Sequence, residues 1–239
     1  MSDTALVIIA RYPQAGQTKT RLARSIGDAY TAQLYRAFVT DLARRFSGQD
    51  DALFWTYSPA EVDYQDFISS LLPEPIPVVR CFPQEGPDLG ARLLHAFQYI
   101  QAQGYQRTIL IGSDLPYLTE DTIVQAKTAL DHADVVLGPA SDGGYYLIAM
   151  CRPYDVFSGI PMSTAVVNEM TIAAAQRQGL RVHQLATLFD IDELPDLQRL
   201  SQMLDADSTL APATAAYLAT IRKIYERNDS IDPTTLNLH

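Results

Sequence analysis

The sequence of 239 residues contains few cysteines, few basic residues and no long apolar run. Its two cysteines, Cys81 and Cys151, stand far apart and outside any CxxC pair, so neither a disulfide framework nor a thiolate zinc site is indicated. With 18 Lys and Arg against 28 Asp and Glu, the net charge of −10 disfavours binding to nucleic acid or to an anionic membrane. No apolar segment approaches the ~18 residues of a membrane span, and no basic signal segment opens the chain. We therefore expect a soluble, cytoplasmic protein.

Short β-branched segments alternate with longer segments of helical periodicity. The expected strands are residues 5–10, 52–57, 76–82, 108–112, 134–138, 145–150 and 180–185. Apolar residues at helical spacing run over 34–46, 89–100, 123–130, 166–174, 197–204 and 217–225. This alternation predicts an α/β fold, with an open and mostly parallel sheet that carries helices on both faces. Residues 142–144 leave no room for a crossover helix, so one antiparallel strand is expected there and the sheet should be mixed.

Three polar residues stand where helices could begin. Thr119, Ser163 and Asp192 each precede an apolar stripe, and their side chains are suited to capping a helix N-terminus. No repeat, low-complexity segment or break in composition divides the chain. We expect one domain over residues 1–227 and a polar tail over 228–239.

A cluster of cations follows the first expected strand. Arg11, Lys19 and Arg21 lie around Gly16, which permits a tight turn before the next helix. Cations beside a helix start are suited to binding phosphate oxygens, so these four residues are candidates for binding a nucleotide. A solvated basic helix start is the alternative interpretation. The loop matches neither GxxxxGK[ST] nor GxGxxG.

Carboxylates follow two other expected strands. Asp114 ends the fourth strand, and Asp192 lies in an acidic cluster with Asp190 after the last one. Side chains at the carboxyl ends of separate strands can converge, and carboxylate oxygens are hard ligands for Mg²⁺ or Mn²⁺. Asp114 and Asp192 are therefore candidate metal ligands. Turn formation or helix capping would also explain them.

Two further loops could complete a ligand site. The loop after the third strand offers amide, backbone and carboxylate groups that could read the edge of a base, in Gln84, Gly86, Asp88 and Leu89. The loop at Asp142, Gly143 and Gly144 could let a ligand approach the backbone, with Asp142 as a candidate general base. A purely structural loop and an Asp-Gly hairpin turn are the respective alternatives.

Together these segments resemble a known family. KTRLA, GSDLP, GPASDGGYYLIA and DIDELPDL occur in this order between about residues 6 and 200. They are similar to the GT-A-type transferases labelled radical-SAM/selenodomain-associated transferase or arsenosugar-biosynthesis glycosyltransferase. The segment around Lys19 and Arg21 also resembles that of phospholactate guanylyltransferase, a nucleotidyltransferase of the same fold. The resemblance implies a Rossmann-like, GT-A (nucleotide-diphospho-sugar transferase) fold that uses Mg²⁺ or Mn²⁺.

Carried over residue by residue, the family pattern implies a role for each candidate. Phosphates would face Lys19 and Arg21, the metal would bind Asp114 and Asp192, the base would lie near Gln84, Gly86, Asp88 and Leu89, and the second substrate would border Asp142, Gly143 and Gly144. The sequence departs from the pattern at three places. Arg11 stands where we expect lysine, Met162 where tryptophan is frequent, and Leu194-Pro195 where a Pro-acid pair is expected.

Two reactions use these same residues. The resemblance favours glycosyl transfer from a nucleotide sugar to a small-molecule acceptor, with release of the nucleoside diphosphate. The dense cationic loop is better suited to a triphosphate, and thus to nucleotidyl transfer with release of pyrophosphate. Because the resemblance covers most of the chain, glycosyl transfer is the leading prediction and nucleotidyl transfer is the alternative. A hypothesis from another class is a sensor that binds a nucleotide without turnover.

Overall fold

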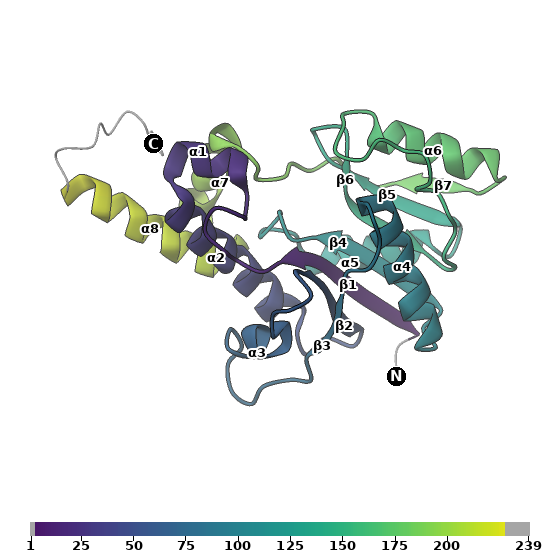
Figure 1. Ribbon diagram of the computed structural model, residues 1–239, viewed down its shortest axis with the longest axis horizontal. Helices are drawn as coiled ribbons and strands as arrows, with labels where there is room; N and C mark the ends of the chain where they lie inside the picture. The colour runs from purple at the N-terminus through teal and green to yellow at the C-terminus, as the bar shows by residue number, and fades with distance from the viewer. Residues whose placement is uncertain (1–2, 228–239) are drawn as a thin grey trace.

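The computed structural model describes residues 3–227 (Figure 1). Seven strands form one sheet in the order β3-β2-β1-β4-β6-β5-β7. They are β1 (Thr4–Arg11), β2 (Ala52–Ser58), β3 (Arg80–Pro83), β4 (Arg107–Gly112), β5 (Val135–Pro139), β6 (Tyr145–Met150) and β7 (Val182–Gln184). β6 runs antiparallel to both β4 and β5, whereas the other neighbouring strands are parallel. The predicted mixed, mostly parallel sheet is confirmed.

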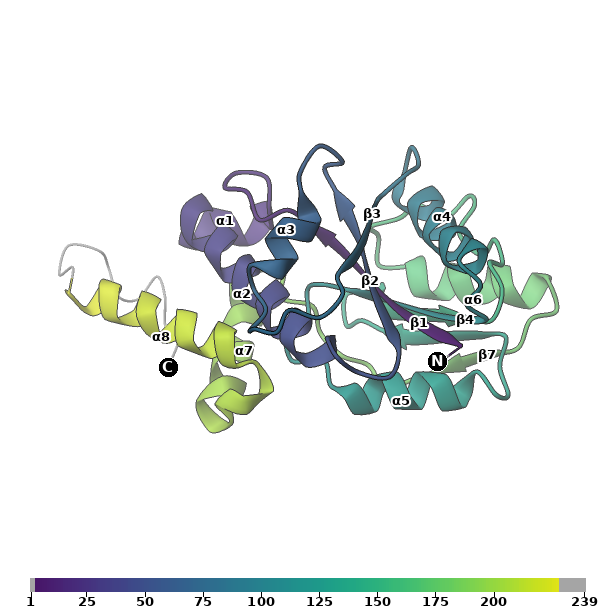
Figure 2. The same ribbon diagram turned by 90° about the horizontal axis from the view of Figure 1, so that it is seen from below.

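Helices cover both faces of this sheet. They are α1 (Thr20–Ile26), α2 (Asp28–Phe46), α3 (Tyr64–Ser69), α4 (Leu89–Ala102), α5 (Glu120–Ala129), α6 (Val167–Arg177), α7 (Leu194–Ala206) and α8 (Pro212–Arg227), with a 3₁₀ turn at Ser208–Leu210. Figure 2 shows α4 and α6 on one face, and α2 and α5 on the other. No helix within residues 3–227 is long and apolar enough to cross a bilayer.

Strand β1 divides the core between the two faces. Leu6 and Ile8 pack into the core shared with α2 and α5, while Ala5 and Val7 pack into the core shared with α4. This alternation follows from the two-residue period of a strand, and it explains why nearly every residue of β1 is apolar.

The strand register brings the candidate loops to one edge. Arg11 of β1 pairs with Ser58 of β2, and Ile9 pairs with Gly112 of β4. The residues after these parallel strands therefore lie side by side. Helices α1 and α7 lie beyond this edge in Figure 1, and the two helices pack against each other.

Several boundaries predicted from the sequence differ in the structure. The third strand begins at Arg80 instead of residue 76, because the preceding prolines, Pro75 and Pro77, cannot donate to a ladder. Ser163 does not cap α6, which starts after Val166, and Ser163 instead lies in the preceding loop with φ 66°. Asp192 does not cap α7, because Glu193 is the N-cap residue.

Two further predictions concern the start of α5 and the C-terminal segment. Thr119 is the N-cap residue of α5, but its hydroxyl hydrogen-bonds to the Thr122 hydroxyl instead of the helix backbone. Residues 228–239, predicted as a polar tail, lie outside the described residues.

Candidate active site

The loop between β1 and α1 is held in a compact turn. The Gln14 carbonyl accepts from the backbone N–H groups of Gln17 and Thr18, and the Thr18 hydroxyl accepts from the Gln14 N–H. Gly16 provides the positive φ (77°) that the turn needs. Lys19 follows as the N-cap residue of α1 in a left-handed conformation, with φ 46° and ψ 54°. Such a backbone is unfavourable for lysine, and residues held in this way are concentrated at functional sites.

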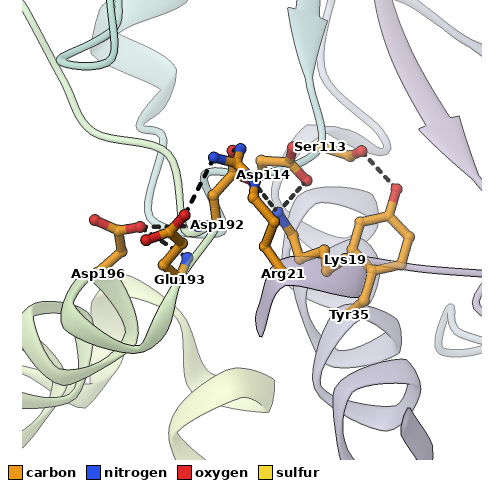
Figure 3. Close-up of polar contacts among 8 residues, drawn as sticks. All are labelled: Lys19, Arg21, Tyr35, Ser113, Asp114, Asp192, Glu193 and Asp196. Atoms are coloured by element: carbon orange, nitrogen blue, oxygen red, sulfur yellow. Dashed lines mark hydrogen bonds and ion pairs between the residues drawn. The ribbon is translucent and has the colours of Figure 1, made fainter. Parts of the chain in front are cut away.

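Lys19 joins two carboxylates from distant parts of the chain (Figure 3). Its Nζ lies 2.8 Å from Asp114 Oδ1 and 3.1 Å from Asp192 Oδ1. The lysine side chain is only 5% exposed, against 40% for Asp114 and 27% for Asp192. Burial alone would lower the pKa of Lys19, but the two carboxylates outweigh it and raise the pKa above its ordinary value. The ammonium therefore stays charged.

Arg21 contacts the same acidic segment from the exposed side. One of its terminal nitrogens pairs with Asp192 Oδ2, and the other lies 3.4 Å from Glu193 Oε1. The backbone of this segment is fixed by Asp196, whose Oδ2 accepts from the N–H groups of Asp192 (3.1 Å) and Glu193 (2.9 Å). The capping box of α7 thus orients the carboxylate of Asp192.

Tyr35 of α2 ties together the ends of β1 and β4. Its hydroxyl accepts from the Arg11 backbone N–H at 3.0 Å and lies 2.6 Å from the Ser113 hydroxyl (Figure 3). Burial, together with the charge of Asp114, raises the pKa of Tyr35 to about 12. The hydroxyl therefore remains protonated, and it holds Ser113 and the adjacent Asp114 in place.

The segment before α7 is tied to the segment after β4. Tyr117 donates to the Phe189 carbonyl (2.7 Å) and accepts from the Phe189 N–H (3.1 Å), and the Ile191 N–H donates to the Asp114 carbonyl (3.2 Å). These bonds explain how Asp114 and Asp192, which are remote in sequence, lie on either side of one ammonium group.

Negative charge accumulates around this point. Burial and, after it, the carboxylates of Asp114, Asp142 and Asp192 together raise the pKa of Asp190 to about 7, although Lys19 lowers it. These carboxylates thus lie close enough to repel one another, and a cation bound near them would relieve part of that repulsion.

The donor set fits a divalent ion that arrives with phosphate. Within residues 3–227, no group of three or more His, Cys, Asp and Glu side chains is arranged as a metal centre. Asp114 and Asp192, however, present two hard oxygens to one point. Mg²⁺ is commonly bound by one or two carboxylates and completed by substrate phosphates and water.

These residues line a cleft of about 660 Å³ at the carboxyl edge of the sheet. Of the residues predicted from the sequence, the cleft is lined by Arg11, Lys19, Arg21, Gln84, Leu89, Asp114 and Asp192. Arg11 and Gln84 also line an adjoining pocket of about 340 Å³. Gln84 is fixed there, because its Nε2 donates to the carbonyls of Ala10 (3.0 Å) and Thr56 (3.3 Å).

The other predicted residues are not among those that line the cleft. They are Gly16, Gly86, Asp88, Asp142, Gly143 and Gly144. Asp88 caps α4 by accepting from the Ala91 N–H at 2.9 Å. Asp142 accepts from the Gly144 N–H at 2.9 Å in the turn between β5 and β6, as the hairpin alternative expects.

Two of these glycines are required by packing. A Cβ at Gly143 would lie 2.0 Å from the Ala165 carbonyl oxygen, and one at Gly86 would lie 2.9 Å from the Ala91 Cβ. Gly143 therefore packs closely against the segment before α6, and Gly86 packs closely against the first turn of α4.

The residues that line the cleft but were not predicted from the sequence as site residues include Tyr35, Arg92, Ser113 and Ser163. Tyr35 belongs to the apolar stripe of α2, and in the sequence only its hydroxyl group distinguishes it from a residue of the core. Ser113 lies within the GSDLP segment, next to a residue that was identified. Arg92 lies in α4 and Ser163 lies in the loop before α6. The sequence pattern does not specify how that helix and that loop run relative to the cleft.

The strand order and the cation-lined cleft define a protein with the fold of nucleotide-diphospho-sugar transferases. A protein from Desulfovibrio desulfuricans G20, provisionally assigned as a nucleotide-diphospho-sugar transferase, has a similar crystal structure. Its TM-score is 0.84 at 33% identity, and the match covers 95% of this chain and 98% of that one. The chain belongs to the family described as "Uncharacterized protein conserved in bacteria (DUF2064)", which matches residues 43–164.

Two further relatives extend the comparison. The phosphoenolpyruvate guanylyltransferase of Chloroflexus aggregans is 31% identical over 130 residues, which is 54% of this chain and 63% of that relative. The match thus spans less than two thirds of that curated relative's length. A cytidylyltransferase from Leptospira borgpetersenii shares the fold, with a TM-score of 0.57, 11% identity and coverage of 97% and 99% of the two chains. The GT-A-type fold and the transferase resemblance expected from the sequence are confirmed.

Proposed function

We propose that this protein is an enzyme that transfers a nucleotidyl group from a nucleoside triphosphate to a small acceptor and releases pyrophosphate. The observation that carries the proposal is the set of cations lining the cleft, Arg11, Lys19, Arg21 and Arg92, in a chain of net charge −10. Within residues 3–227, neither Arg11 nor Arg92 is paired with a carboxylate. Unpaired guanidinium groups in a cleft favour a polyanionic ligand.

The proposed reaction assigns different work to the two ends of the cleft. Arg11 and Arg92 bind phosphate oxygens without competition from protein carboxylates. Lys19 and Arg21 stabilise the negative charge that grows on the leaving pyrophosphate. An acceptor oxygen attacks the α-phosphorus, the bond from that phosphorus to the α,β-bridging oxygen breaks, and pyrophosphate leaves with the bond electrons.

Asp114 and Asp192 are the residues that would hold Mg²⁺ or Mn²⁺. A bound divalent ion would neutralise phosphate oxygens and so lower the barrier to attack of the acceptor oxygen on the α-phosphorus. Asp142 is the proposed general base, which would place the acceptor beside the turn between β5 and β6, outside the residues that line the cleft. GTP is the first donor to test, because the curated relative is a guanylyltransferase.

Glycosyl transfer is the second candidate. It is favoured by the relative from Desulfovibrio desulfuricans G20, which matches over nearly the whole chain. In that reaction the bond between the sugar and the β-phosphate oxygen breaks, and a nucleoside diphosphate leaves.

Product analysis separates these candidates. The protein is incubated with each nucleoside triphosphate and with nucleotide sugars, together with Mg²⁺ or Mn²⁺ and a panel of phosphorylated, carboxylate and hydroxyl acceptors. Phosphorus NMR should detect pyrophosphate that forms only with an acceptor. Release of nucleoside diphosphate from a nucleotide sugar would instead establish glycosyl transfer. Tight nucleotide binding without turnover across the panel would identify the protein as a sensor and refute both reactions.

A further inference from the structure

Lys19 takes a position that a metal ion would also need. Its ammonium lies between Asp114 Oδ1 (2.8 Å) and Asp192 Oδ1 (3.1 Å), the carboxylate oxygens that face each other across the cleft. A divalent ion bound to both oxygens would lie within a few ångströms of Nζ. At such a distance two positive charges repel by several kcal/mol even at an effective dielectric constant of about 20.

We infer that the Lys19 ammonium and a divalent cation are alternative occupants of the position between Asp114 and Asp192. In the protein without nucleotide, the lysine fills that position. The cation enters when the phosphates of a nucleotide draw the ammonium away and supply the remaining ligands. This inference rests on the proposed function in one respect, since it takes the physiological ligand to carry phosphates.

The Lys19 side chain can move away without leaving Asp114 or Asp192 as an uncompensated charge. Arg21 pairs with the other oxygen of Asp192, Oδ2, so that carboxylate keeps a cationic partner. Asp114 is 40% exposed and can be solvated from the cleft. The lysine itself is the N-cap residue of a short helix, and its long side chain can turn toward the cleft that it lines.

The exchange makes metal binding depend on nucleotide binding. A cation alone has to displace a buried ammonium that forms two charge-assisted hydrogen bonds. A cation that arrives with a triphosphate does not, because the phosphates replace the carboxylates as partners of Lys19. The protein should therefore bind Mn²⁺ weakly by itself and strongly in the presence of a triphosphate.

Removal of the lysine tests this inference in the absence of any nucleotide. Mn²⁺ is titrated into the full chain, and free Mn²⁺ is followed by electron paramagnetic resonance. Lys19→Gln should bind Mn²⁺ about tenfold more tightly than the original protein, or better, because a competing charged hydrogen bond is gone. Lys19→Gly should show the same gain. Glycine also accepts the left-handed backbone at φ 46°, which protects the fold in that variant.

Arg21→Gln is the matched control. It also removes one positive charge next to Asp192, but from a side chain that is 56% exposed and that leaves the Lys19 position filled. Its Mn²⁺ affinity should change by less than about threefold. The double variant Lys19→Gln/Asp114→Asn should lose the gain, which would locate the bound ion.

Each result bears on the inference. If both folded Lys19 variants bind Mn²⁺ no more tightly than the original protein, or gain no more than Arg21→Gln, the shared position is refuted. Circular dichroism and thermal unfolding establish that the variants are folded. Because this titration uses neither donor nor acceptor, a gain in Mn²⁺ affinity would support the inference even if no transfer reaction were found.

Discussion

The replacement Asp190→Asn tests how strongly the acidic cluster opposes folding. Burial and, after it, the carboxylates of Asp114, Asp142 and Asp192 together raise the pKa of Asp190 to about 7, although Lys19 lowers it. Ionisation of this carboxyl group is therefore less favourable in the folded protein than in the unfolded chain. Asparagine has a similar shape but cannot ionise.

The sign and size of the effect follow from proton linkage. In the unfolded chain, the pKa of an aspartate is ~3.9. Because the folded protein holds this proton more tightly, the contribution of Asp190 to stability is full below about pH 4 and is lost as the pH rises toward about 7. Between pH 5 and pH 8 the loss amounts to roughly 2–3 kcal/mol of unfolding free energy.

Urea unfolding at pH 5 and at pH 8 measures the effect. The difference in unfolding free energy between Asp190→Asn and the original protein should move in favour of the variant by roughly 2–3 kcal/mol on going from pH 5 to pH 8. Titrating groups that do not interact with Asp190 cancel, since both proteins contain them. Asp50→Asn, at an exposed position, is the control and should give the same difference at both pH values. If the difference in unfolding free energy between Asp190→Asn and the original protein were also the same at pH 5 and pH 8, the reasoning would be refuted.

Three further substitutions have distinct expected outcomes. Arg92→Gln should weaken triphosphate binding about tenfold in calorimetry, since it removes an unpaired guanidinium from the cleft, and unchanged affinity would remove Arg92 from the site. Tyr35→Phe should lower the unfolding free energy in urea by about 1–3 kcal/mol, because the Ser113 hydroxyl loses its buried partner; a neutral effect would contradict this. Gly143→Ala should cost about 2 kcal/mol or more in thermal unfolding, since its Cβ would lie 2.0 Å from the Ala165 carbonyl oxygen at a positive φ of 90°, and wild-type stability would refute the packing argument.

The fold could be predicted from the sequence because local and global signals agree. The apolar runs that became β1, β4 and β6 are continuous, and the short Asp142–Gly144 connection correctly indicated an antiparallel strand. The strand expected from residue 76 was too long, since hydrophobicity alone does not register that Pro77 lacks a donor. Hydrophobic patterns therefore located the strands better than their ends.

The candidate site was predictable only where it follows the strand ends. The rule that ligands bind at the carboxyl edge of an open sheet indicated Lys19, Asp114 and Asp192, which the structure brings together. The same rule could not indicate Arg92, because its position depends on how α4 crosses the sheet. Nor could it distinguish Asp88, a helix cap, from a residue that faces a ligand.

The contact between Lys19 and Asp192 also has a consequence for the order of folding. Its partners are separated by 173 residues, so one of the longest loops in the chain must close before they meet. An anion that binds at this contact can therefore bind only after the segment around Asp192 has docked against the loop that contains Lys19. Such an anion would bind only the folded protein, and its presence during refolding should stabilise the folded state against unfolding.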